Sequence, residues 1–367
     1  MAKNGYAVLD SDLHVVEPPD LWERYIDAPF KSRAPRGIGV WVVEIEGKLM
    51  PGGVAHAGTA TSASARRDRE RFRTINERGW SPEAQLDAMD AEGIDVGVMY
   101  PTRGLFVQSI DGMEPKLAAA IARAYNDWLY DFCATNPQRL VGAGMISPFD
   151  VDEAVTEARR AVKELGFKAI FLRPNPVNGR NWHDAYYDPL WSELESLNVS
   201  LGFHEGLGGH LPQVGDRFGK NVMLRHTVCH PLEQMLAAVS FCGGGILERH
   251  PRLRVGFLEG NASWLPFLLW RMDEHYEWIG DVHARELTLP PSAYFKRQCY
   301  VSVECDEEPI KGVFDLMGID NVVFSTDFPH PDSKFPGAIE RFLKLPLPHE
   351  AKRAILWDNC ARFYALS

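Results

Sequence analysis

The chain has 367 residues, of which 45% are hydrophobic and 24% are charged, so it can build a sizeable core and is not a disordered protein. Its formal net charge of -11 argues against a nucleic-acid partner, because nucleic acids select clustered lysine and arginine. We find no signal-peptide pattern and no apolar run approaching membrane-spanning length, and the six cysteines form no Cys-x-x-Cys pair. We therefore expect a cytoplasmic protein with free thiols and no membrane partner.

The first apolar run, residues 6–9, leads into a group of polar residues that could bind a metal. Asp12 and His14 follow it, and Pro18 ends any strand. Residues two apart on a strand share a face, so both side chains would point the same way at the carboxyl end of this strand. One carboxylate oxygen beside one imidazole nitrogen suits a divalent cation. Asp-x-His is a common pattern, however, and the alternative is a helix cap at Asp12 with His14 on the surface.

Residues 31–80 interrupt the regular part of the chain. They contain a predicted hairpin at 39–47, a stretch of small residues at 52–65 and an arginine run at 66–73. The arginines alternate with acidic residues, which is typical of a solvated face and not of a polyanion site. We interpret this segment as an excursion over the active-site mouth.

From residue 81 onward, predicted helices alternate with short apolar strands. Ser81 is a predicted N-cap, with proline at the first helical position, and this helix extends to residue 92. Further helices are predicted at 115–135, 152–165, 188–197, 231–249, 265–276, 308–317 and 349–365. Strands are predicted at 96–100, 141–146, 169–172, 199–203, 253–258, 299–303 and 322–325.

Together with residues 6–9, these runs make eight strands, nearly all separated by helices. Apolar strands without alternation are typical of parallel sheets that are buried on both faces. We therefore predict an α/β fold, a single (β/α)8 TIM barrel over residues 1–367 with the excursion inserted after the first strand. A doubly wound open sheet is the rival, but it usually has a glycine-rich phosphate turn where this chain has Asp-Ser-Asp-Leu-His.

In such a barrel, chemistry gathers at the carboxyl ends of the strands. Polar residues occupy these predicted ends along the whole chain, although each one alone could be a cap or a structural residue. Four of them would converge as two nitrogen and two oxygen donors: Asp12, His14, His204 and Asp327. This donor set suits one divalent cation, zinc first and manganese as the alternative, with an open position for water or a small-molecule substrate.

The chain resembles the amidohydrolase superfamily, in the branch of aminocarboxymuconate-semialdehyde decarboxylase and related aromatic acid decarboxylases (amidohydrolase family 2). The resemblance spans nearly the whole chain. It is carried by Asp-Leu-His-Val-Val-Glu-Pro (12–18), Met-Asp-Ala-Glu-Gly-Ile-Asp-Val (89–96), Gly-Phe-His-Glu (202–205), His-Pro-Arg-Leu-Arg-Val (250–255), Trp-Leu-Pro-Phe (264–267), Ser-Thr-Asp-Phe-Pro-His (325–330) and Asn-Cys-Ala-Arg-Phe-Tyr (359–364). It implies a (β/α)8 barrel, a divalent metal and usually a homodimer.

The chain departs from the family pattern at two positions. The first strand usually offers His-x-His or Glu-x-His, and here Asp12 takes the first place. The related decarboxylases carry a histidine after the sixth strand for acid–base steps, and here Glu259 stands there. Glu259 could transfer protons, support a metal ligand or hold the neighbouring loop. The fourth strand ends at Arg173 without the lysine that some two-metal members carbamylate, which favours one metal.

The resemblance implies a metal-dependent, non-oxidative decarboxylase of a small aromatic or unsaturated acid. Asp327 or Glu259 would protonate the carbon that loses the carboxyl group, and His330 is the further catalytic candidate. Arg173 could pair with the substrate carboxylate or form a structural ion pair. The remaining candidates for substrate binding are His204, Glu205, Trp264 and His230, the last of which we expect in a loop between the fifth and sixth strands.

Two other functions remain open on the sequence. A hydrolase of an amide, lactone or other C–N or C–O bond would use the same metal to acidify a bound water, and Asp327 would take the proton. The glutamate at position 259 favours this alternative, because hydrolysis needs no additional histidine acid. A non-catalytic binding barrel is the third hypothesis, and it is disfavoured because competent residues fill all four ligand positions.

Overall fold

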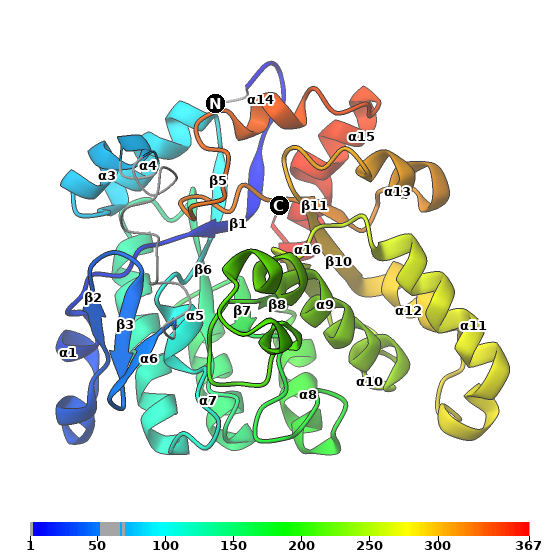
Figure 1. The fold of residues 1–367 in the computed structure, drawn as a ribbon, viewed down its shortest axis with the longest axis horizontal. Coiled ribbons are helices and arrows are strands. Elements are labelled where there is room, and N and C mark those ends of the chain that lie inside the picture. The colour runs from blue at the N-terminus through cyan, green and yellow to red at the C-terminus, as the bar shows by residue number, and fades with distance from the viewer. Residues whose placement is uncertain (1–2, 52–66, 68–69, 367) are drawn as a thin grey trace.

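The computed structural model describes residues 3–51, 67 and 70–366. Eight parallel strands form one sheet, and their order in space follows their order along the chain. They are β1 (Leu9–His14), β5 (Val96–Tyr100), β6 (Leu140–Met145), β7 (Ala169–Leu172), β8 (Ser200–His204), β9 (Val255–Leu258), β10 (Cys299–Val303) and β11 (Val322–Phe324). Helices surround this sheet (Figure 1). The predicted (β/α)8 barrel is confirmed.

Polar contacts join β11 to β1 and bring the barrel close to full closure. The hydroxyl of Ser11 donates to the carbonyl oxygen of Phe324 at 2.6 Å. The carboxyl of Asp10 lies 2.5 Å from the hydroxyl of Thr326, and burial raises the pKa of this carboxyl to about 8. These contacts hold the first strand against the segment that follows the last one, where the site residues lie.

The predicted position of the first strand was wrong. The strand begins at Leu9, not at residue 6, and it contains the polar residues that were expected at its carboxyl end. Every one of its six residues is buried. Polar side chains are tolerated there because Asp10 and Ser11 find hydrogen-bond partners across the closure. The other strands lie close to their predicted positions, and β7 is buried at every residue, as expected for a parallel sheet.

Most helices also lie near their predicted ranges, and side-chain caps explain several of their ends. The hydroxyl of Ser81 accepts the backbone N–H of Ala84, and Gly93, with φ of 92°, ends α4 (Pro82–Glu92). The other helices on the barrel are α5 (Gly104–Val107), α6 (Pro115–Cys133), α7 (Val151–Lys163), α8 (Asp188–Leu197), α11 (Leu265–His283), α12 (Pro291–Gln298), α13 (Ile310–Met317), α14 (Ala338–Phe342), α15 (His349–Arg353) and α16 (Asn359–Tyr364). A π-helical segment, Ala354–Asp358, joins the last two.

The helix predicted at 231–249 differs most from the structure. Two helices occupy this region, α9 (Val222–Gly243) and α10 (Ile246–Arg249). Pro231 lies inside α9 and does not start it, because the side chain of Asn221 caps the helix by accepting the backbone N–H of Leu224 at 3.1 Å. The loop position expected for His230 was therefore wrong, and this residue lies on α9.

After β1 comes the short helix α1 (Leu21–Tyr25). The predicted excursion at 31–80 contains a small antiparallel sheet of β2 (Arg36–Ile38), β3 (Val42–Ile45) and β4 (Lys48–Met50). The predicted hairpin at 39–47 thus becomes two consecutive hairpins. Arg103, after β5, ties this sheet to the barrel, because its side chain donates to the carbonyl oxygens of Gly39 and Val42. Residues 52–66 and 68–69, with the whole small-residue stretch and part of the arginine run, lie outside the described residues. The helix α3 (Arg73–Glu77) then leads back to the barrel.

The cysteines are free and buried, as predicted. Among the described helices, none combines the length and the apolar character needed to cross a membrane.

Candidate active site

Two residues of β1 face the centre of the site. Asp12 and His14 are two positions apart, share a face of the strand and are fully buried. Their side chains approach each other, with 3.3 Å between Nε2 of His14 and Oδ1 of Asp12. The predicted pairing of these two residues on one face is confirmed by this geometry.

Both buried histidines of the candidate metal site are oriented by backbone carbonyls. Nδ1 of His14 lies 2.8 Å from the carbonyl oxygen of Pro101, and Nδ1 of His204 lies 2.7 Å from that of Glu205. A carbonyl accepts a hydrogen bond only from a protonated nitrogen, so Nδ1 carries the hydrogen. Nε2 is left with a lone pair that can bind a metal. The two Nε2 atoms point to Asp12, whose Oδ1 lies 3.5 Å from Nε2 of His204.

Asp327 completes the group from the segment after β11. Its φ of 53° places it in the left-handed region, which few residues other than glycine adopt and which recurs at functional sites. Its Oδ1 lies 3.2 Å from Nε2 of His14 and 2.7 Å from Nδ1 of His330. The backbone N–H of His14 donates to the carbonyl oxygen of Phe328 at 2.8 Å and holds this segment against β1.

The donor atoms at this centre are buried and make charge contacts with one another and with His330, but they have no hydrogen-bond partner of good geometry among the described residues. They are both carboxylate oxygens of Asp12, Nε2 of His14, Nε2 of His204 and Oδ1 of Asp327. Unpartnered buried polar atoms are costly, and such a convergent set is the pattern expected where a cation binds. The residues that the sequence predicted as ligands therefore fit a divalent metal.

His330 also lies within this group. Donor atoms of His14, His204, Asp327 and His330 all lie within 4.8 Å of one another, a set that includes His330 and leaves out Asp12. We favour Asp12 as the ligand, because Nδ1 of His330 faces Asp327 and its Nε2 lies 3.2 Å from the hydroxyl of Thr102. The ring of His330 stacks on that of His14 with centroids 3.9 Å apart, which makes it a neighbour of the ligands.

The charges at the centre depend on one another. Burial alone would lower the pKa of His14, but the carboxylates of Asp12 and Asp327 outweigh it and raise this pKa to about 10. Burial likewise favours neutral Asp327, but His330 and His14 hold its pKa below the usual range. The pKa of His204 is lowered by burial. A divalent cation bound here would supply positive charge to these carboxylates in exchange for the proton of His14.

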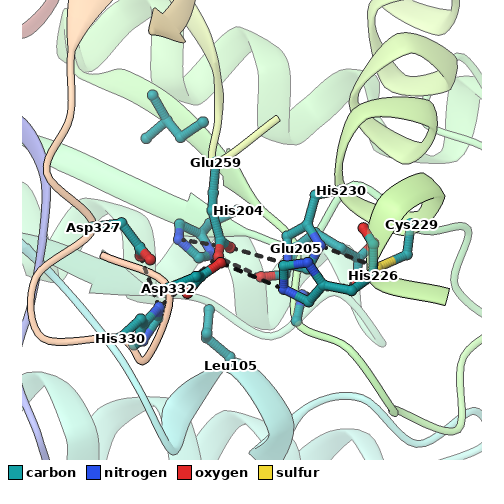
Figure 2. A network of polar contacts seen from close by, with 12 residues as sticks. Leu105, His204, Glu205, His226, Cys229, His230, Glu259, Asp327, His330 and Asp332 are labelled. Carbon is teal, nitrogen blue, oxygen red and sulfur yellow. Dashed lines mark hydrogen bonds and ion pairs between the residues drawn. The ribbon is translucent and has the colours of Figure 1, made fainter. Parts of the chain in front are cut away.

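Glu259, after β9, lies at the edge of the same centre. Its φ is 48°, and its backbone N–H donates to the hydroxyl of Ser302 at 2.9 Å. Its Oε2 lies 3.3 Å from Nε2 of His204 and 3.2 Å from Nε2 of His230, so it stands between two imidazoles (Figure 2). Burial and the charge of Asp327 raise the pKa of Glu259 well above its ordinary value.

Arg173 and Glu205 form a buried ion pair beside the centre, with 2.5 Å between Nη2 and Oε1. The guanidinium also donates to the carbonyl oxygens of Leu105 and Gly206 and to the side chain of Asn175. Glu205 in turn accepts hydrogen bonds from side-chain amides and from the backbone of the following loop. The hydrogen-bonding groups of Arg173 and Glu205 are therefore mostly occupied by other groups of the protein.

Other predicted residues are placed by the loops around β9. The indole N–H of Trp264 donates to the carbonyl oxygen of Gly260 at 2.8 Å, and this half-buried side chain lies at the start of α11. His230 faces Glu259 from α9. Gln234, one turn further along α9, donates to the carbonyl oxygens at the ends of β8 and β9, at 3.0 and 2.6 Å, and so sets the distance between helix and strands.

The sequence analysis did not identify two neighbours of the site, Asp332 and Trp41. Asp332 lies 3.6 Å, through Oδ2, from Nε2 of His226, and both flank Glu259 (Figure 2). Trp41 reaches the site from the inserted sheet, with its ring centroid 6.3 Å from that of His330. The His-x-x-x-His spacing of 226 and 230 could have signalled a helical pair, had the helix been predicted to start before Pro231.

Comparisons with known proteins agree with this architecture. A family model described as Amidohydrolase matches residues 10–366. A 2-amino-3-carboxymuconate-6-semialdehyde decarboxylase of Dictyostelium discoideum is 28% identical over 296 residues, covering 80% of this chain and 79% of the relative. A crystal structure of an amidohydrolase from Mycobacterium avium subsp. paratuberculosis K-10 has a TM-score of 0.79 at 22% identity, covering 98% of this chain and 99% of that one. A dihydroxybenzoic acid decarboxylase from Polaromonas sp. JS666, solved with bound manganese and the inhibitor 2-nitroresorcinol, has a TM-score of 0.69 at 19% identity, covering 98% and 97%. At these identities the likeness to the two structures shows the fold.

Proposed function

This chain belongs to the amidohydrolase family, and from that premise we propose that it is a metal-dependent, non-oxidative decarboxylase of a small aromatic or unsaturated carboxylic acid. The observation that carries the proposal is the set of buried, unpartnered donor atoms that converge at the strand ends. The Dictyostelium relative and the Polaromonas structure, which are similar to this chain, are both named as decarboxylases, one of an unsaturated acid and one of an aromatic acid. This supports decarboxylation over hydrolysis.

The proposed metal ligands are Asp12, His14, His204 and Asp327. Two imidazoles and two carboxylates suit zinc, which remains our first expectation, and manganese is the alternative that the Polaromonas structure contains. When bound, the cation would act as a Lewis acid toward the substrate carboxylate and a neighbouring oxygen. The backbone carbonyls behind His14 and His204 keep both rings aimed at the ion.

Loss of carbon dioxide leaves a carbon that must receive a proton, so the site needs an acid beside the ligands. Asp327 and Glu259 are the two carboxyl groups placed for this step. Asp327 lies 2.7 Å from His330, which can hold a proton next to it. Glu259 has a raised pKa because of its burial and the nearby charge of Asp327, which favours its protonated form.

The proposed substrate-binding residues surround this acid. His230 and Trp264 flank the loop after β9, and His204 borders both the metal and Glu259. Arg173 and Glu205 hold each other and the loop after β8, which favours the structural ion pair over direct binding of the substrate carboxylate. We further propose that the chain is one domain and that the described part of its excursion at 31–80 covers the mouth, because the ring of Trp41 lies beside that of His330.

A homodimer is proposed on the exposed face of α11. Phe267, Trp270, Trp278 and Val282 lie along this helix, and each is more than half exposed. Aromatic side chains gathered on one helix are unusual on a monomer surface and are enriched in interfaces. A second copy, related by a twofold axis, would cover the same face on both chains.

The free, buried cysteines support the expectation of a reducing compartment such as the cytoplasm.

The decisive experiment is a product assay with zinc-loaded and manganese-loaded protein. Hydroxybenzoates and unsaturated dicarboxylates are compared with amides and lactones of similar size. Release of carbon dioxide from an acid, abolished in Asp327→Ala, is the expected result. Formation of a new carboxylate from an amide or lactone, without carbon dioxide from any acid, would overturn the proposal in favour of hydrolysis.

A further inference from the structure

A second group of metal-binding side chains lies beside the proposed centre, and the single-metal function does not use it. His226 and His230 are one turn apart on α9, and their ring centroids lie 4.4 Å from each other. They face two carboxylates: that of Glu259, which follows β9, and that of Asp332, which lies in the segment after β11 (Figure 2). Three separate parts of the chain thus bring two imidazoles and two carboxylates together.

Two distances within this group match those between ligands of one ion. Nε2 of His230 lies 3.2 Å from Oε2 of Glu259, and Nε2 of His226 lies 3.6 Å from Oδ2 of Asp332. Two ligands of a tetrahedral ion with bonds of 2.1 Å lie about 3.4 Å apart. Donor atoms of His226, His230 and Glu259 all lie within 4.8 Å of one another, and so do those of Glu259, Asp327 and Asp332.

The buried members of the group are held in place. Nδ1 of His230 lies 3.0 Å from the thiol of Cys229, so its Nε2 is the atom that faces Glu259. Gln234 fixes α9 to the ends of β8 and β9, and the hydroxyl of Ser302 fixes the backbone of Glu259. Second partners of this kind orient the ligands in metal sites.

The outer members open the group to solvent. The side chains of His226 and Asp332 are 42% and 52% exposed, so an ion can reach the buried half of the site. An exposed ion pair such as that of His226 with Asp332 adds little to the stability of the fold. Stability therefore does not explain why these two residues converge on Glu259. A plain ion pair between His230 and Glu259 would need neither of them.

We propose that His226, His230, Glu259 and Asp332 bind a second divalent cation, with Glu259 bridging it to the first. The bridge follows from the position of Oε2, which lies 3.3 Å from His204 on one side and 3.2 Å from His230 on the other. Two imidazoles with two carboxylates select a borderline cation such as zinc or cobalt over magnesium or calcium. This role occupies Glu259 and leaves Asp327 with His330 as the proton carrier.

The test is the zinc content of the full-length chain. Protein stripped with a chelator is dialysed against zinc, freed of loose ions and measured by elemental analysis. The wild type should hold two zinc ions per chain, and His226→Ala and Asp332→Ala should each hold one. His283→Ala, on the exposed histidine that ends α11, is the matched control and should hold two.

The outcomes separate this inference from the proposed function. One zinc ion in the wild type, with none lost in His226→Ala, would overturn the second site and leave the first intact. Two ions in His226→Ala and in Asp332→Ala would also overturn it. A chain that binds no zinc would contradict both proposals. As a second readout, the cobalt-loaded wild type should show spin coupling between two ions, and His226→Ala should lose it.

Discussion

Replacement of Arg173 by methionine should destabilise the protein strongly. Its guanidinium lies in the interior with Glu205 as its ion partner, and it donates to the carbonyl oxygens of Leu105 and Gly206. Breaking a buried ion pair by removing one partner costs about 3–5 kcal/mol, because the other charge is left buried and unpaired. We therefore expect Arg173→Met to lower the free energy of unfolding by about 3–5 kcal/mol.

A double-mutant cycle separates the ion pair from other effects of the substitution. Glu205→Met alone should also destabilise, and the double variant Arg173→Met/Glu205→Met should recover most of the loss, because no unpaired charge remains. Urea unfolding of the metal-loaded protein measures each step. The control is Arg353→Met, which breaks an exposed pair with Asp358 and should cost less than about 1 kcal/mol.

The opposite pattern would refute this reasoning. If Arg173→Met unfolds at the wild-type urea concentration but raises KM for the substrate, Arg173 binds the substrate carboxylate. The structural ion pair would then be the wrong alternative.

Three further predictions concern other parts of the molecule. Burial and the nearby charge of Glu205 raise the pKa of Glu233 from 4.5 to about 7. The folded state therefore binds more protons than the unfolded state between these values, and stability falls as pH rises through this window. In urea unfolding, Glu233→Gln should raise the free energy of unfolding by about 2–3 kcal/mol at pH 8 and by less than about 1 kcal/mol at pH 5. An equal gain at both pH values would contradict the raised pKa of Glu233. Glu307 accepts the backbone N–H groups of Ala262 and Ser263 at 2.9 and 2.7 Å, so Glu307→Gln should cost about 1–3 kcal/mol of unfolding free energy, whereas an unchanged value would show that the loop needs no anchor. Trp278→Asp should turn a dimer into a monomer in analytical ultracentrifugation, while substitution of the exposed Tyr130 of α6 by aspartate should not. A wild-type monomer would refute the proposed interface.

The barrel could be predicted because its strands are buried on both faces. Runs such as 96–100 and 169–172 are continuous apolar segments, and the structure places strands at these positions. The pairing of Asp12 with His14 was also predictable, since it needs only the two-residue period of a strand. Which side chains share a face of one strand depends only on the local sequence, so it can be predicted without the fold.

The rest depends on contacts that are distant in sequence. The polar part of β1 depends on a hydrogen bond that Ser11 donates and on one that Asp10 accepts, both with residues more than 300 positions away. The start of α9 was missed because Pro231 is typical of a first turn, yet the helix begins at the cap by Asn221. For the same reason, His226 and His230 could not be recognised as a helical pair.

The measurement that tests the central claim most directly is the metal content of wild-type protein beside His14→Ala. His14 contributes to the first site only, and its Nε2 has no other hydrogen-bond partner among the described residues. We predict that the metal-loaded variant holds one divalent ion per chain fewer than the wild type and releases no carbon dioxide from any acid that the wild type decarboxylates. Equal metal content in both proteins would contradict the assignment of the first site, and with it the proposed chemistry.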